Sequence, residues 1–379
     1  LSYIGSSGVG MATNRFGTGV AGGVSMLFSD ITGDNQMFAA LAVNGEIYDF
    51  GGQVGYQNQK SPIRWGGMVS HIPYPYAFLN YRLDTLATND GPVQVENLQI
   101  IQYRTFEDQV MAFAFYPIST TRRIEASASL SWYYFRIDAY NNYYQFGYYV
   151  GESRERLDAP PGFNLQRVSL SYVGDDSYFG IASPIRGRRY RLGAEQIFGS
   201  VNMTSVTADY RRYFFLKPFT FAFRGTHYGR YGKEADDQDL FYPLYLGYPG
   251  YVRGLDYNSL YKLQGSALMD EQWSFENLLG SKALLAGAEI RFPLTGPERL
   301  ALIPSGLFFT ELTFFFDAGV AWRNDDQITF NPDELREPNK RYPYFSIGPS
   351  LRINVFGALI LEPFYAFPFQ TGGIGKGVW

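Results

Sequence analysis

Residues 312–322 read Leu-Thr-Phe-Phe-Phe-Asp-Ala-Gly-Val-Ala-Trp and set a pattern that recurs along the chain. Every even-numbered position holds an apolar side chain. The odd-numbered positions include Thr313, Asp317 and Gly319. A period of two is that of a β-strand, whose successive side chains point to opposite faces. The stretch therefore predicts a strand with one apolar face and one face of charged and small residues.

The same alternation occurs in 284–294 and in 345–355. The face opposite the apolar one carries Gly287, Glu289 and Arg291 in the first, and Ser346, Gly348, Ser350, Arg352 and Asn354 in the second. Each segment also has an aromatic residue near an end. About ten residues at a tilt of ~45° cross a bilayer core, and aromatic residues gather at its two interfaces. These segments therefore predict transmembrane β-strands.

Composition excludes several protein classes. The 379 residues carry a net charge of -4, which argues against the basic field of a nucleic-acid binder. Charged residues make up 18%, below the ~25% of a soluble domain. The absence of cysteine excludes disulfide scaffolds, thiolate metal sites and cysteine catalysis. Apolar runs fall short of the ~18 residues of a transmembrane helix. The mean hydropathy of -0.19 suits a membrane barrel, in which every second residue faces lipid.

Alternation along the whole chain predicts an all-β fold, a 16-stranded antiparallel transmembrane β-barrel. It would form one domain over 1–379, with 1–17 as an N-terminal lead-in. The predicted strands are 18–30, 35–48, 50–58, 62–73, 98–118, 121–137, 163–175, 187–199, 202–216, 219–231, 241–249, 281–294, 307–323, 344–356, 358–369 and 371–379. An even number is expected of a closed bacterial barrel. The alternative, a soluble sandwich or propeller, is disfavoured because the polar face is rich in Gly, Ser and Thr and no 40–50-residue repeat occurs.

The lengths of the connections conflict with this strand count. The long ones are 74–96, 138–162, 232–240, 252–280 and 324–341. An outer-membrane barrel carries its long loops on one rim. The count places the loops after 241–249 and 307–323 on one rim and the other three on the opposite rim. Either a strand in the first two-thirds is split wrongly or both rims carry long loops.

A series of segments in the last third carries a family resemblance. It begins with Gly-Tyr-Pro-Gly-Tyr-Val-Arg-Gly-Leu-Asp-Tyr at 247–257. Gly-Ala-Glu-Ile-Arg-Phe-Pro follows at 287–293, and the later segments are 314–322, 346–352 and 362–369. Together they resemble the C-terminal barrel of the BamA-like and TamA-like outer-membrane assembly factors, the surface-antigen superfamily. Val252-Arg253-Gly254 matches a signature of the sixth extracellular loop in that family, with Leu255 in place of the usual aromatic residue.

The resemblance implies that the loop 252–280 folds back into the barrel lumen. There Arg253 would meet carboxylates on the next two strands, which are Glu289 and Asp317 here. Alternation places both carboxylates on the polar face. Charge-assisted bonds would pin the loop and compensate the carboxylates, as a structural latch. The alternative is that both carboxylates pair with other cations such as Arg291 or Arg352.

Glycine marks the first and last predicted strands, at Gly19, Gly22, Gly23, Gly372, Gly373 and Gly375. Because glycine weakens strand pairing and packing, these strands would close the barrel with a weak seam. In the resembled family this seam is a lateral gate. The alternative is that the glycines accommodate girdle aromatics or barrel curvature. The short sequences Phe-Ser-Asp at 28–30 and Gly-Ile-Gly-Lys-Gly-Val-Trp at 373–379 also resemble those of Bacteroidota barrels that follow a periplasmic propeller domain.

Catalytic and metal-binding signatures are absent. His71 and His227 lack a ligand spacing, and neither a Gly-x-Ser-x-Gly motif nor a phosphate loop occurs. We therefore expect no enzyme, no cofactor and no metal site. The acidic runs 236–239 and 324–326 are interpreted as solvated loop tips rather than Ca²⁺ sites. The basic clusters 122–123 and 186–191 could meet lipid phosphates at a rim, but lining of the lumen is favoured.

The predicted function is insertion or translocation of outer-membrane or surface proteins, through a weak seam between strands 1 and 16, in a Gram-negative outer membrane. The alternative is a scaffold barrel of an outer-membrane complex, and a solute pore has less weight. Expected partners are the lipid bilayer and proteins of that complex. No periplasmic domain such as the POTRA domains of the resembled family is expected within this chain. The native start and any signal peptide are expected to lie outside it.

Overall fold

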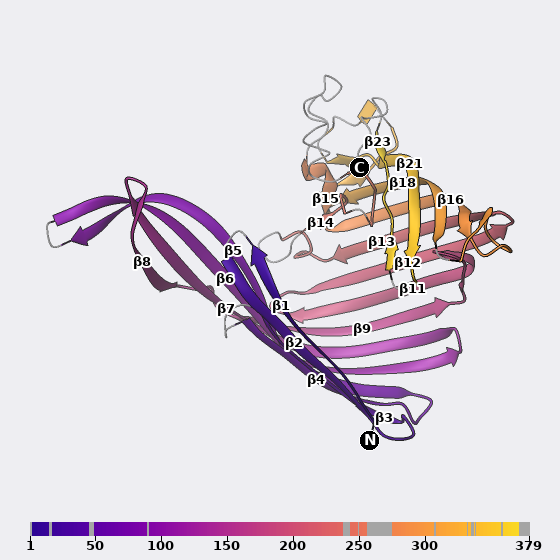
Figure 1. Ribbon diagram of the computed structural model, residues 1–379, viewed down its shortest axis with the longest axis horizontal. Helices are drawn as coiled ribbons and strands as arrows, with labels where there is room; N and C mark the ends of the chain where they lie inside the picture. Colours follow the sequence, from indigo (N-terminus) through magenta and orange to yellow (C-terminus); the bar gives the residue numbers. More distant parts are fainter. Residues whose placement is uncertain are drawn as a thin grey trace. The chain divides into compact units, whose positions relative to one another are not determined.

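The computed structural model describes residues 2–370 except 15–16, 45–48, 89–90, 238–242, 249, 256–274, 307, 332, 335–336, 338 and 358. Its regular structure is almost entirely β-strand (Figure 1), so the prediction of an all-β fold is confirmed. The segment Phe275–Leu278 forms a short 3₁₀ helix, η2. In this described part of the chain, no helix is both long and apolar enough to cross a membrane. The predicted strand 371–379 lies outside the described residues.

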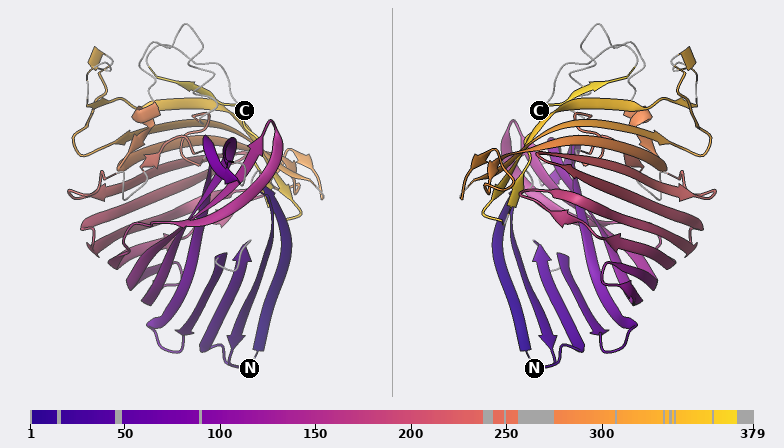
Figure 2. Two further views of the ribbon diagram at one scale, coloured as in Figure 1. Left: turned by 90° about the vertical axis from the view of Figure 1, so that its left-hand side faces the viewer. Right: turned by 90° about the vertical axis from the view of Figure 1, so that its right-hand side faces the viewer.

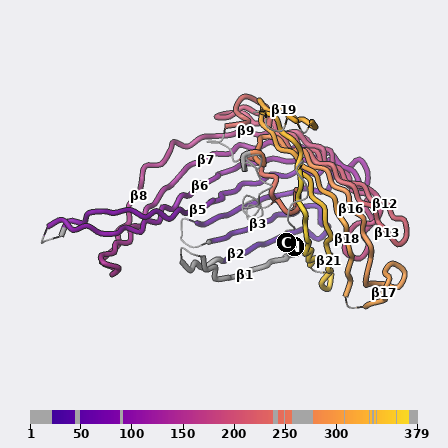
Figure 3. The backbone as a smooth tube through the Cα atoms, turned by 90° about the horizontal axis from the view of Figure 1, so that it is seen from above, coloured from indigo at the N-terminus to yellow at the C-terminus, as the bar shows by residue number. Residues whose placement is uncertain are grey.

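Two compact units divide the chain. Unit 1 comprises 1–116, 126–168 and 198–200. Its strands are β1 (Ser2–Asn14), β2 (Gly17–Ser29), β3 (Asn35–Asn44), β4 (Phe50–Asn58), β5 (Arg64–Thr88), β6 (Gly91–Ser119) up to residue 116, β7 (Arg122–Gln145) from residue 126, β8 (Tyr148–Leu157) and the first part of β9 (Phe163–Asp175). Antiparallel pairing joins β1 to β2 and continues strand by strand to β6, and β7 pairs with β8. Figure 3 shows the labelled strands β2, β3, β5 and β6 following one another in this order.

Two segments that were expected to be loops are strands. β5 and β6 pair without interruption from Arg64, opposite Phe115, to Thr88, opposite Gly91. β7 and β8 form a second hairpin, which turns at Phe146 and Gly147 with positive φ. The prediction that 74–96 and 138–162 are loops is therefore wrong. Their ribbons expose large apolar side chains on both faces, so no buried apolar face marks these strands in the sequence. The exposed set includes Leu79, Tyr81, Leu83, Tyr148 and Tyr149.

Buried polar contacts hold these ribbons together instead. Arg104 of β6 is fully buried and donates to Asp49 at 2.9 Å and to Asp138 of β7 at 2.7 Å. Asn97 and Gln99 of β6 both donate to Asn141 of β7, at 3.0 and 2.8 Å. Hydrogen-bonded polar side chains therefore occupy buried positions where a soluble sheet would have an apolar core.

The structure bears on the predicted lead-in and on the first of the two strands predicted to form the seam. Residues 2–14 of the expected lead-in form β1, which pairs with β2 along its whole length. Gly19, Gly22 and Gly23 lie in β2, and Gly22 stands opposite both Val9 of β1 and Val43 of β3. The strand predicted as the first of the barrel is therefore an interior strand. Serine and glycine fill much of 2–14, which hides this strand from a search for apolar alternation. Gly372, Gly373 and Gly375 lie outside the described residues, so the seam stays a prediction.

Unit 2 comprises 117–125, 169–197 and 201–379. Its strands besides the end of β9 are β10 (Tyr178–Phe179), β11 (Pro184–Gly199), β12 (Met203–Leu216), β13 (Phe219–Tyr231), β14 (Leu244–Tyr245), β15 (Leu279–Gly280), β16 (Lys282–Gly296), β17 (Ile303–Pro304), β18 (Phe309–Trp322), β19 (Gln327–Ile328), β20 (Lys340–Arg341), β21 (Tyr344–Val355), β22 (Leu359–Leu361) and β23 (Phe367–Phe369). The long antiparallel sheet runs β11–β12–β13–β16–β18–β21, and β22 and β23 both pair with β21. Figure 2 shows its long strands, pink to yellow, side by side.

The predicted strand 241–249 is not part of this sheet. Among its described residues, 243–248, only Leu244–Tyr245 forms a short strand, which pairs with β15. β13 instead pairs directly with β16. The long connections after β13 and after β18 therefore leave the same end of the unit 2 sheet, because two strands separate them. The short turn between β12 and β13 lies at the other end. When 241–249 is left out of the strand count, the long connections of unit 2 lie at one end of its sheet. The conflict between loop lengths and strand count therefore disappears within this unit.

Opposed residues of neighbouring strands define the two faces of the unit 2 sheet. One face, here called the apolar face, exposes large hydrophobic side chains such as Leu284, Ile290 and Phe314. The other, the cavity face, carries the buried polar residues Arg291, Asp317 and Arg352. A broad exposed apolar face marks an interaction surface rather than a soluble exterior.

Candidate functional site

The chain between β13 and β16 packs onto the cavity face. Leu246, Val252, Leu255 and Leu278 have no exposed surface, and together with Ala283, Leu285, Ala321 and Tyr344 they form an apolar cluster. Both described ends of the predicted loop 252–280 are thus held against the sheet. This packing explains the apolar Leu246 of the predicted strand 241–249, because Leu246 faces the cluster and not the exterior.

Two glycines allow this close packing. Gly254 has φ of +86°, and a Cβ there would lie 2.8 Å from the Cβ of Ala366. Gly319 of β18 lies under the loop, where a Cβ would lie 2.6 Å from Cγ2 of Val252. A side chain at either position would strain the turn or push the loop away from the sheet. The Val-Arg-Gly motif therefore combines an apolar anchor, an arginine and a turn residue.

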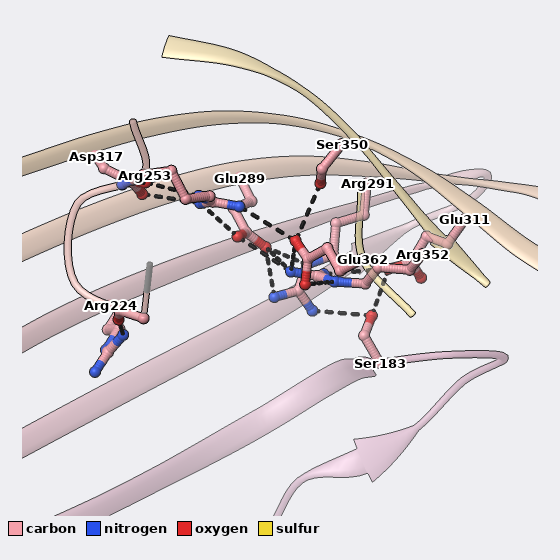
Figure 4. A network of polar contacts seen from close by, with 11 residues as sticks. Ser183, Arg224, Arg253, Glu289, Arg291, Glu311, Asp317, Ser350, Arg352 and Glu362 are labelled. Atoms are coloured by element: carbon pink, nitrogen blue, oxygen red, sulfur yellow. Dashed lines mark hydrogen bonds and ion pairs between the residues drawn. The ribbon is translucent and has the colours of Figure 1, made fainter. Parts of the chain in front are cut away.

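Arg253 is held by three carboxylates from different elements of the sheet. Its Nε and Nη2 donate to Asp317 of β18 at 2.7 and 2.8 Å. Nη2 also donates to Glu289 of β16 at 2.9 Å, and Nη1 to Glu362 at 3.3 Å (Figure 4). The guanidinium lies 3.7 Å from the ring centroid of Phe315. Bidentate pairing and cation–π contact both fix the plane of the arginine.

The charge of Arg253 is preserved in this setting. Burial alone would lower the pKa of the guanidinium. The hydrogen bond to Asp317 and the charges of Asp317, Glu289 and Glu362 outweigh burial and raise the pKa of Arg253 above its ordinary value. Arg253 is therefore a permanent cation, and only displacement of the loop can separate it from its partners.

A second layer of ion pairs extends from these carboxylates. Glu289 also accepts from Arg291 at 2.8 Å and from Arg352 at 3.0 Å. Arg352 donates to Glu362 at 3.0 Å and to the buried Glu311 at 3.4 Å. The Arg253 cluster, as named here, consists of Arg253, Arg291, Arg352, Glu289, Glu311, Asp317 and Glu362. Its three arginines and four carboxylates nearly balance, as buried charges require.

The structure brings together every residue of the predicted latch. Arg253 contacts Glu289 and Asp317, Val252 packs in the apolar cluster, and Gly254 makes the turn beside Ala366. The alternative partners, Arg291 and Arg352, share Glu289 with Arg253, so the two alternatives coexist. The assignment of these contacts as a functional latch stays a prediction.

Sequence reasoning missed Glu362, Glu311 and Ser183. Glu362 lies where the predicted strand 358–369 breaks into β22 and β23. Pro363 follows it and lacks an N–H group, so a regular ladder cannot continue. The Glu-Pro pair after Leu-Ile-Leu was the available signal. Ser183, which donates to Glu311 at 2.6 Å and accepts from Arg291 at 3.0 Å, had no sequence signal.

A cavity of about 400 Å³ lies beside the Arg253 cluster. Charged side chains line much of it. They are Arg211, Arg224, Arg253, Glu289, Arg291, Asp317, Arg352 and Glu362. Arg211 pairs bidentately with Asp209 at 2.8 Å, and Arg224 donates to the carbonyl oxygen of Gly250 at 2.7 Å. The cavity is therefore lined largely by polar groups and is closed on one side by the loop.

The other predicted features are placed as follows. Over the described ranges, no group of three or more His, Asp or Glu side chains is arranged to hold a metal ion. In the acidic runs, Asp236 accepts from the backbone of Asn324, and Asp326 accepts from Arg341. In the basic cluster 186–191, Arg191 pairs with Glu125 at 2.8 Å. Arg188 faces the opposite side of the sheet, so the interpretation of the whole cluster as lumen-lining is wrong for this residue.

Comparisons with known proteins bear on this fold. The family model of the Omp85 superfamily domain matches residues 44–373. The crystal structure of BamA from Haemophilus ducreyi lacking POTRA domains 1–3 is similar, with a TM-score of 0.54 and 11% identity over 99% of this chain and 68% of that chain. CdiB from Acinetobacter baumannii gives a TM-score of 0.48 and 13% identity over 99% of this chain and 58% of that chain. No curated protein matches.

Proposed function

This chain belongs to the Omp85 superfamily, and on that premise we propose that it is the membrane part of a machine that inserts or translocates proteins at a Gram-negative outer membrane. The observation that carries the proposal is the engagement of one loop arginine, Arg253, by carboxylates of β16, β18 and the segment between β22 and β23. The exposed apolar face of unit 2 suits contact with lipid.

In the proposed mechanism the Arg253 cluster is a latch that fixes the loop on the cavity face. A client strand would add to a free edge of the sheet by backbone hydrogen bonds, as in other strand-addition complexes. β1 replaces the predicted strand 18–30 as the candidate edge, because β2 is an interior strand. Further domains or partner proteins would deliver the client.

The function is tested by depletion of the protein in its host. We expect the folded amounts of other outer-membrane barrels or surface proteins to fall, and the wild-type chain to restore them. Arg253→Ala should restore them poorly, and Arg253→Lys partly, since lysine keeps the charge but loses the bidentate geometry. Arg123→Ala is the matched control. Arg123 also forms an ion pair, with Glu125, but the Arg123 side chain is 54% exposed.

The same experiment separates the scaffold alternative. If depletion leaves other outer-membrane proteins at normal levels but releases a co-purifying protein from the membrane, the chain is an anchor and not an insertion machine. Each variant must first show the heat-dependent gel mobility of a folded barrel. This check distinguishes loss of function from loss of folding.

A further inference from the structure

Two arginines stand side by side on the apolar face of unit 2. Arg188 of β11 lies directly opposite Arg212 of β12 in the strand register. Directly opposed residues point to the same face, and the next such pair is Tyr190 and Tyr210, the latter 46% exposed. The neighbouring Arg211 lines the cavity and so lies on the opposite face. Arg188 and Arg212 therefore point away from the cavity, among exposed hydrophobic side chains.

The charges of this pair are only partly compensated. Like charges directly opposed across two strands destabilise a sheet, and charge on a lipid-exposed face costs more. Asp176 accepts from the backbone N and Nε of Arg188, at 2.6 and 3.0 Å. The guanidinium of Arg212 lies 5.0 Å from the ring centroid of Phe214, and the ion pairs among the described residues include none of Arg212. The two guanidinium groups thus have one ion-paired carboxylate between them, Asp176 beside Arg188.

A row of tyrosines borders the arginines. Tyr190 donates to the hydroxyl of Tyr172 at 3.0 Å, and the ring of Tyr190 stacks on Tyr210 at 6.4 Å between centroids. Tyrosine and arginine side chains with apolar stems gather at the headgroup level of a bilayer. The pair also lies toward the end of the sheet where β9 stops at Asp175 and the chain turns at 217–218. These residues therefore mark the membrane interface on the side of the short turns.

We propose that Arg188 and Arg212 form a binding site for the phosphate of an anionic phospholipid in the leaflet next to the short turns. The negative charge of a phosphodiester would offset the excess positive charge of the pair, and the two planar guanidinium groups suit its oxygens. Its acyl chains would lie along the apolar face, near Leu192 and Phe223. The site depends on the proposed membrane location but not on client insertion or on the Arg253 latch.

The test is native mass spectrometry of the detergent-purified chain titrated with phosphatidylglycerol or phosphatidylcholine. We expect preferential retention of phosphatidylglycerol by the wild type. Arg212→Gln should weaken it about fivefold and Arg188→Gln/Arg212→Gln about 25-fold, from the usual contribution of one arginine at a membrane surface. Arg191→Gln is the matched control, since Arg191 lies in the same strand on the other face and pairs with Glu125. Heat-dependent gel mobility verifies folding of every variant.

Three results would overturn the site. They are equal retention of the two lipids by the wild type, unchanged preference in the folded double variant, and an equal loss in Arg191→Gln. Release of phosphatidylglycerol by excess inorganic phosphate would show a site for free anions and not for lipid. Because the readout is lipid retention, a failed client-insertion experiment leaves this site intact, and failure of this test leaves the proposed function intact.

Discussion

At the scale of single residues, burial makes Arg253 and Asp317 depend on one another. Their side chains are only 11% and 7% exposed, so neither charge can turn to water when its partner is removed. Glu289 is different, because Arg291 and Arg352 would still compensate it. Asp317 is therefore the partner that responds most strongly to the loss of Arg253.

We predict that Arg253→Ala lowers the free energy of unfolding by roughly 3–5 kcal/mol, the usual result of breaking a buried pair. Asp317→Asn should also destabilise, and the double variant should lose less than the sum of the two by about 1–3 kcal/mol. Urea unfolding followed by gel mobility measures all three. Arg123→Ala, at an exposed pair, should change stability by less than ~0.5 kcal/mol. Additive effects would show that the two residues act independently.

Glu362 gives a second residue-scale prediction. Glu362→Gln keeps the size of the side chain but removes the charge that links Arg253 to Arg352. Because Glu362 is 31% exposed, more than Asp317, we expect a smaller loss of stability than for Asp317→Asn. The same urea series measures it. A loss as large as that of Asp317→Asn would place the centre of the cluster at Glu362 instead.

Residue by residue, the sequence predicted the centre of the site but not its surroundings. Alternation placed Glu289 and Asp317 on the polar face, and a motif resemblance pointed to Arg253. Glu362 was missed because it enters the cluster through a break in a strand, which a period-two pattern does not describe. Ser183 comes from a connection more than one hundred positions from Arg291 and Glu311, and such pairing has no local signature.

At the scale of elements, the loop is held by apolar packing as well as by charge. We predict that Val252→Cys, the sole cysteine in the chain, resists labelling by a maleimide in the folded protein, since Val252 has no exposed surface. Adding Gly319→Val should expose it, because side-chain atoms at 319 would displace the loop. Gly306→Val, where a Cβ meets nothing within 4 Å, is the control. Equal labelling in all three backgrounds would mean that the loop does not rest on β18.

Strand prediction succeeded where one face is apolar and failed elsewhere. β13, β16, β18 and β21 follow the alternation within a few residues. β8 and the outer parts of β5 to β7 were missed because large apolar side chains such as Leu83 and Tyr148 are exposed, while buried positions such as Asn97 are polar. The segment 241–249 was mistaken for a strand because a loop that packs against a sheet is as apolar as a strand that faces lipid.

At the scale of the whole molecule, family membership and the all-β fold agree with the sequence prediction. The predicted count of sixteen strands stays a prediction, with β1 gained and 241–249 lost. The antiparallel order of unit 2 gives a test of orientation. Asp325 lies in a long connection at one end of the sheet, and Lys217 lies in a short turn at the other.

We predict that a membrane-impermeant maleimide labels Asp325→Cys on intact cells but labels Lys217→Cys only after lysis. Long loops of outer-membrane barrels face outward and short turns face the periplasm. The native chain has no cysteine, so the unmodified protein is the blank. Surface labelling of Lys217→Cys alone would invert the proposed orientation.

The hairpin of β5 and β6 has a consequence for what the cell shows to its surroundings. Twenty-five paired residues in β5 reach about 80 Å at ~3.3 Å per residue, whereas a tilted crossing of the bilayer core uses about ten. The remaining ribbon, some 50 Å long, would stand clear of the lipid headgroups. In the proposed orientation, antibodies, phages and proteases would have access to the exposed end of this hairpin.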